Sequence, residues 1–171
     1  MFERILVPLD GSEPAARALP VAREIAQRFH GGLVLLEAVR RLDDWHHSFS
    51  EAPDDPRHQD MEERAVEGAR AHLGRVAAGV HGVSVEIDVR IGPAAEAILQ
   101  ATRDNGCTLV CMAAHGRGRA GLAQAHERGH AIPWLLGGIT DRVLHTSQVP
   151  VLVVRPDARL AAPAVVEAHQ A

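Results

Sequence analysis

The chain has 171 residues, of which 46% are hydrophobic and 23% are charged, so it is long enough to form one globular domain with its own core. A formal net charge of -4 at pH 7 gives no electrostatic reason to expect a DNA or RNA partner. No apolar stretch approaches the roughly 20 residues of a membrane span, and an early apolar run leaves no room for a signal peptide, so we expect a cytoplasmic protein without a membrane partner.

The first apolar run, residues 5–9, predicts a strand that ends at a polar turn. Ser12 in that turn is a suitable N-cap for a helix, and Pro14 fits its first turn. Because proline lacks an N–H group, Pro20 predicts a kink inside this helix. The apolar residues of the predicted helix recur at helical spacing: Ala15, Leu19, Ala22, Ala26 and Phe29.

The pair Gly31-Gly32 ends the predicted helix, and residues 33–39 form the second predicted strand. Residues 41–58 are polar and contain two prolines, which predicts a loop. A second helix is expected after this loop. Its expected apolar face consists of Met61, Ala65, Ala69, Leu73, Val76 and Val80.

The second half of the chain repeats the alternation of strand and helix. Residues 85–91 alternate between apolar and polar, which predicts a strand with one solvated face. Gly92-Pro93 begins a helix, and residues 109–113 and 149–154 predict the last two strands. The core residues expected from that helix are Ala94, Ala97, Ile98 and Ala101. We expect the domain to cover residues 1–156 and the Ala-rich segment 157–171 to be a flexible tail.

Alternating strands and helices with apolar strands predict an α/β fold, in which helices cover both faces of an open five-stranded parallel sheet. The alternating strand 85–91 fits one edge of this sheet. Strand 149–154 would be the other edge, although it is apolar on both faces. An uncovered apolar edge promotes aggregation, so we expect it to be covered by a second copy in a homodimer or by the tail.

A glycine-rich, arginine-bearing segment begins at residues 115–119, directly after the fourth predicted strand. It ends at Gly137-Gly138, where another helix begins. The bare N–H groups and the positive dipole end of a helix favour an anion at such a place. The segment therefore predicts a phosphate or nucleotide ligand.

These motifs together resemble the universal stress protein family over residues 2–155. The resemblance implies a Rossmann-like sheet of strand order 3-2-1-4-5, a homodimer through strand 149–154, and, in many members, ATP bound where the strand order reverses. Other members bind no nucleotide. The segments that carry the resemblance are residues 5–12, 92–94, 109–119, 136–144 and 149–154.

The resemblance also implies roles for individual residues. Asp10 matches an acidic residue that contacts the nucleoside sugar, and Pro8 lies beneath it. Ala38 or Val39 matches a wall beside the adenine, and the phosphates of ATP can bring Mg²⁺ with them. The implied nucleotide-binding residues are Pro8, Asp10, Val39, Met112, Ala113, Gly116, Arg117, Gly137, Gly138, Ile139 and Thr140.

The chain departs in three ways from the family's ATP-binding pattern, Gly-x-x-Gly, nine residues, then Gly followed by Ser or Thr. Ala113 replaces the first glycine, so its methyl group can crowd a ligand. Gly138 replaces the hydroxyl residue, a loss of roughly 1–2 kcal/mol that Thr140 can partly replace. The third departure is a long cationic insert, residues 117–136, which either covers the site as a lid or fills it.

These features predict a dimeric regulatory module of the stress response that binds ATP or another adenine nucleotide. The alternative is a nucleotide-free dimeric interaction module whose insert 117–136 occupies the cleft. No nucleophile–base–acid set and no Walker A lysine motif emerge from the sequence. It therefore gives no positive reason to expect an enzyme and leaves open only slow ATP hydrolysis or autophosphorylation.

Two further motifs receive weaker interpretations. His126 and His130 lie four residues apart in the insert with His115 nearby, which is a hypothesis for a metal-responsive switch. A glycine and a proline beside them favour irregular backbone and solvated histidines, so we expect no metal site. Residues 116–121 match GxGxxG, but the dinucleotide fingerprint belongs after the first strand, so NAD is not expected.

Overall fold

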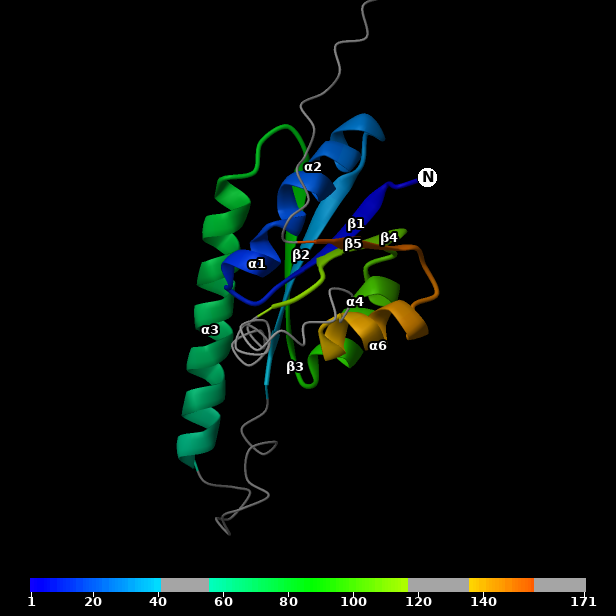
Figure 1. The fold of residues 1–171 in the computed structure, drawn as a ribbon. Coiled ribbons are helices and arrows are strands. Elements are labelled where there is room, and N and C mark those ends of the chain that lie inside the picture. Colours follow the sequence, from blue (N-terminus) through cyan, green and yellow to red (C-terminus); the bar gives the residue numbers. More distant parts are fainter. Residues whose placement is uncertain (41–55, 117–135, 156–171) are drawn as a thin grey trace, which may run out of the picture.

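The computed structural model describes residues 1–40, 56–116 and 136–155 of the chain (Figure 1). Five parallel strands form one sheet in the order β3-β2-β1-β4-β5, which confirms the implied topology. Some of the sequence interpretations fall outside the described residues. They concern the tail, nearly all of the insert, and the insert residues Arg117, His126 and His130. The strands are β1 Arg4–Leu9, β2 Gly32–Val39, β3 Ser84–Ile91, β4 Leu109–Ala113 and β5 Val151–Val154.

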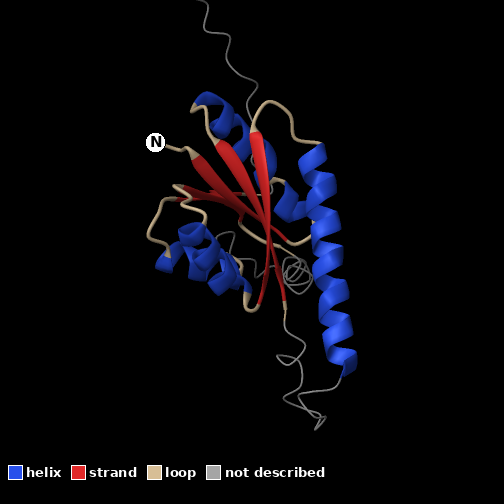
Figure 2. Cartoon of the chain, turned by 180° about the vertical axis from the view of Figure 1, so that it is seen from behind, coloured by secondary structure: helices blue, strands red, loops and turns tan. Residues whose placement is uncertain are grey.

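Helices cover both faces of the sheet (Figure 2). Helices α2 and α3 pack with one set of buried strand residues, and α4 and α6 pack with the set on the opposite face. This arrangement confirms the α/β fold class. The helices are α1 Glu13–Ala16, α2 Ala18–Arg28, α3 Pro56–Ala78, α4 Ala94–Asp104 and α6 Gly138–Thr146. No helix among the described residues is long and apolar enough to cross a membrane.

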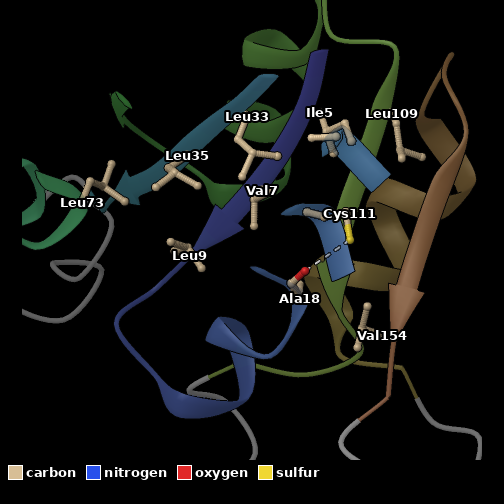
Figure 3. Packing of buried hydrophobic residues seen from close by; sticks show 12 residues of the cluster. Ile5, Val7, Leu9, Ala18, Leu33, Leu35, Leu73, Leu109, Cys111 and Val154 are labelled. Atoms are coloured by element: carbon tan, nitrogen blue, oxygen red, sulfur yellow. Dashed lines mark hydrogen bonds between the residues drawn. The ribbon is translucent and has the colours of Figure 1, made fainter. Parts of the chain in front are cut away.

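The two cores follow from the alternation of side chains along each strand. Ile5, Val7 and Leu9 enter the core on the α2 and α3 side, whereas Leu6 enters the other. Cys111 belongs to the first core and is fully buried, with its Sγ 3.6 Å from the carbonyl oxygen of Ala18 (Figure 3). It acts as a small apolar residue of the core.

The first predicted helix is two helices rather than one kinked helix. Ser12 caps α1 as predicted, since its Oγ accepts a hydrogen bond from the N–H of Ala15 at 3.3 Å. Helix α1 ends just before Arg17, three residues before Pro20, and α2 begins just after Arg17. Pro20 cannot donate to the carbonyl of Ala16, and its ring would clash there. The proline therefore separates two helices one turn before its own position.

Helix α3 begins at Pro56, inside the region predicted as a loop, and proline is well suited to a first helical position. Its predicted apolar face is buried only in part. Ala69 and Leu73 are buried, whereas 53% of the surface of Met61 is exposed. Helix α3 therefore packs on the described sheet through its second half.

Edge strand β3 differs from the predicted pattern of one apolar and one solvated face. Ile87 and Ile91 on its apolar face are 46% and 44% exposed. On the other face, Arg90 pairs with Asp88 at 2.9 Å and with Asp104 of α4 at 2.5 Å. The polar face is thus half-buried, because an ion-pair network joins it to α4.

Glycine-to-alanine substitutions should have opposite effects at two places in this fold. A Cβ at Gly74 would meet no atom within 4 Å, so Gly74→Ala in α3 should stabilise the protein by about 1 kcal/mol through helix propensity. A Cβ at Gly31 would lie 2.5 Å from the carbonyl oxygen of Phe2, so Gly31→Ala should destabilise it by about 1 kcal/mol. Urea unfolding measures the change in the free energy of unfolding for both variants. Changes of the same sign would contradict the packing described at Gly31 and Gly74.

Candidate functional site

A pocket lies at the carboxyl ends of the central strands, where β1 has β2 on one side and β4 on the other. This is the switch point at which open α/β sheets generally bind ligands. Helices α4 and α6 complete its walls. The residues that line it are Pro8, Leu9, Asp10, Ala15, Leu36, Ala38, Ala94, Ile98, Met112, Ala113, His115, Gly116, Ile139 and Thr140.

One wall of the pocket is apolar and comes from three elements: Leu36 and Ala38 of β2, Ile98 of α4 and Met112 of β4. Of the two residues implied for this wall, the structure brings Ala38 to the pocket, and Val39 is not among the lining residues. The reason is the strand alternation, which puts Leu36 and Ala38 on the same face of β2. Such a wall suits a flat, apolar ring system.

Asp10 lies at the end of β1 and is half-buried. Its Oδ1 accepts hydrogen bonds from the N–H of Ser12 at 2.9 Å and from the Ser12 hydroxyl at 2.5 Å. Its Oδ2 lies beside Gly116, so close that a Cβ at that position would overlap it. The carboxylate is thus fixed at the pocket, where it can accept hydrogen bonds from ligand hydroxyl groups.

The N-terminus of α6 opens on the same pocket, since Ile139 and Thr140 of its first turn line it. The N-cap residue Gly137 makes no side-chain capping bond, and its own N–H donates to the carbonyl of Ala114 at 2.9 Å. The N–H groups of Gly138, Ile139 and Thr140 have no acceptor within a helix that begins here. They carry the positive end of the helix dipole and suit an anion.

Thr140 is the buried polar residue of this site, with 3% of its surface exposed. Its Oγ1 donates to the carbonyl oxygen of Ala113 at 3.0 Å, which ties α6 to the end of β4. The sequence suggested that the Thr140 hydroxyl could replace the phosphate-binding hydroxyl that is missing at Gly138. In the structure, this hydroxyl donates its proton to the protein backbone instead. The backbone N–H of Thr140 stays suited to an anion.

The set of nucleotide-binding residues implied by the sequence left out several lining residues, of which His115 is the polar one. His115 follows the end of β4 and precedes Gly116, and this neighbourhood was the signal that could have identified it. The apolar residues that it missed are Leu9, Ala15, Leu36, Ala94 and Ile98. They come from segments far apart in the chain.

Neither cysteine contributes a nucleophile to the pocket, because neither lines it. Burial raises the pKa of the Cys107 thiol to about 11 and that of the Cys111 thiol to about 12, so both stay protonated near neutral pH. Within residues 1–40, 56–116 and 136–155, no group of three or more His, Cys, Asp or Glu side chains could hold a metal ion.

Comparison with known proteins gives a family for this fold and sequence. The family model described as the universal stress protein family matches residues 1–155. The universal stress protein A homolog 2 of Coxiella burnetii is 28% identical over 155 residues, which cover 90% of this chain and 95% of that protein.

Solved structures that share the fold include two universal stress proteins. Universal stress protein UspA from Lactobacillus plantarum is 21% identical with a TM-score of 0.70, over 90% of this chain and 98% of that chain. A universal stress protein family protein from Arabidopsis thaliana with AMP bound is 15% identical with a TM-score of 0.55, over 91% of this chain and 93% of that chain.

Proposed function

This chain belongs to the universal stress protein family, and on that premise we propose that its switch-point pocket binds an adenine nucleotide, AMP or ATP, as a regulatory ligand. One observation carries the proposal. The carboxylate of Asp10, the apolar wall and the N-terminus of α6 all meet at the same pocket. A nucleotide needs such a set: an acceptor for its sugar, an apolar surface for its base and donors for its phosphate.

Each part of the nucleotide has a partner among the lining residues. The base would lie against Leu36, Ala38 and Met112, and the sugar hydroxyls would donate to Asp10. The phosphate would accept hydrogen bonds from the first turn of α6. Gly116 and Arg117, and Mg²⁺ with a triphosphate, are proposed additions to the phosphate site.

The solved Arabidopsis protein with AMP bound supports an adenine nucleotide as the ligand class. In this chain, the N-terminus of α6 offers donors for phosphate, and two polar groups beside it bond to the backbone instead. Those two groups are the hydroxyl of Thr140 and the N–H of Gly137. The donors of the α6 N-terminus therefore suit one phosphate group.

A ligand panel tests this function through thermal unfolding of the protein with AMP, with ATP and Mg²⁺, with inorganic phosphate and without ligand. AMP at about 100 times its dissociation constant should add about 2.7 kcal/mol, a rise in Tm of roughly 5–10 °C. ATP that stabilises more than AMP at equal concentration would assign further phosphate contacts. No change with either nucleotide would contradict the proposal and favour the nucleotide-free interaction module.

We also propose a homodimer through β5 in the cytoplasm. Strand β5 is one edge of the sheet, and its residues 151–153 are apolar and only half-buried in the single chain. A second copy that pairs along this edge would remove both the exposed apolar surface and the unpaired backbone groups. Sedimentation equilibrium distinguishes this dimer from a monomer.

A further inference from the structure

Ser12 donates two hydrogen bonds to one oxygen of the Asp10 carboxylate. Both the N–H and the hydroxyl of Ser12 donate to Oδ1, at 2.9 and 2.5 Å. The hydroxyl has only one proton, and its oxygen already accepts from the N–H of Ala15 at 3.3 Å. These bonds therefore orient the hydroxyl proton toward Oδ1 and fix the rotation of the carboxylate about its side chain.

The other oxygen of the carboxylate lies on the side of Gly116. A Cβ on Gly116 would overlap Oδ2 and lie 3.9 Å from Oδ1. The φ of Gly116 lies outside the left-handed region, so space rather than backbone conformation requires glycine here. Asp10 and Gly116 both line the pocket, so the carboxylate reaches the pocket beside Gly116.

We infer that Ser12 is a positioning residue of the nucleotide site: it holds Oδ1 so that Oδ2 faces the sugar, and it thereby sets a preference for ribonucleotides over nucleotides without sugar hydroxyls. The inference rests on the proposed nucleotide function. Its chemistry is direct, because ribose hydroxyls are donors and a carboxylate is a strong acceptor. A carboxylate free to rotate would lose part of this interaction to disorder.

The test compares the dissociation constants of AMP and 2′,3′-dideoxy-AMP. Their ratio in the wild-type protein should be about thirtyfold, the value for one hydrogen bond to a charged group. Ser12→Ala should lower this ratio to about fivefold or less, whereas Ser12→Thr, which keeps the hydroxyl, should restore it. A purely structural role as helix cap would weaken the binding of both ligands equally and leave the ratio unchanged.

A second pair of variants keeps the test independent of the cap of α1. Gly116→Ala places a methyl group on Oδ2 and should lower the same ratio, while Gly74→Ala, the same change on an open face of α3, should not. An unchanged ratio in both Ser12→Ala and Gly116→Ala, with AMP still bound, overturns the inference alone. Absence of AMP binding to the wild-type protein overturns the proposed function together with it.

Discussion

Asp10→Asn should weaken AMP binding about thirtyfold, a loss of about 2 kcal/mol, and should leave the binding of 2′,3′-dideoxy-AMP unchanged or slightly stronger. Asparagine has nearly the shape of aspartate and keeps one oxygen that can accept from Ser12. It replaces the charged acceptor beside Gly116 by an amide, so ribose loses a charge-assisted bond. The removed negative charge also repelled the phosphate, which explains the expected sign for the dideoxy ligand.

Calorimetric titration of AMP and of 2′,3′-dideoxy-AMP into the wild-type protein and into Asp10→Asn measures the four dissociation constants. Asp10→Ala should weaken AMP binding more than Asp10→Asn does, because it also removes the acceptor of the two Ser12 hydrogen bonds. Equal losses of affinity for AMP and dideoxy-AMP would show that Asp10 supports the pocket without contacting the sugar. Unchanged AMP affinity in Asp10→Asn would remove Asp10 from the site.

Thr140→Val should destabilise the protein by about 2 kcal/mol, because it removes the buried hydroxyl that donates to the Ala113 carbonyl and leaves that oxygen without this donor. Valine has the shape of threonine, so the packing of α6 is kept. The backbone N–H at position 140 also stays. AMP affinity should therefore change by less than about threefold, a difference of less than 1 kcal/mol.

Two matched variants isolate the hydrogen bond. Thr140→Ser keeps the hydroxyl and should retain most of the stability, while Thr146→Val, at the exposed end of the same helix, should cost less than about 0.5 kcal/mol. Chemical denaturation measures all three. A tenfold or larger loss of AMP affinity in Thr140→Val with little loss of stability would instead make its hydroxyl a phosphate ligand.

The strands could be predicted from the sequence because apolar runs separated by turn residues are local signals. The N-cap at Ser12 was predicted for the same reason, since a capping serine needs only its own turn. The strand order came from the resemblance to the universal stress protein family, since no local pattern contains it. Pro20 was expected to kink one helix, whereas the structure has two helices that meet at Arg17, because proline acts on the carbonyl four residues earlier. The exposure of Met61 depends on how far α3 extends along the sheet, which no local pattern contains.

The pocket itself could be located from the sequence only in outline. Leu36, Ile98 and His115 reach it through strand pairing and helix packing, which the residues beside them do not determine. The choice between Ala38 and Val39 depends on which face of β2 turns toward α4. Gly116 lies against Asp10 because β1 pairs with β4. The glycine that was interpreted as part of a phosphate loop therefore also leaves space for the Asp10 carboxylate, the proposed acceptor for the sugar.

The most direct measurement for the nucleotide site is a calorimetric titration of AMP into the wild-type protein and into Ala38→Phe. Ala38 lines the apolar wall and is half-buried, so a phenyl ring there would fill the space of the base while the fold, checked by circular dichroism, is kept. We expect saturable binding of one AMP to each wild-type chain and no measurable binding to the variant. Equal binding to both proteins, or none to the wild type, would contradict a nucleotide site in this pocket.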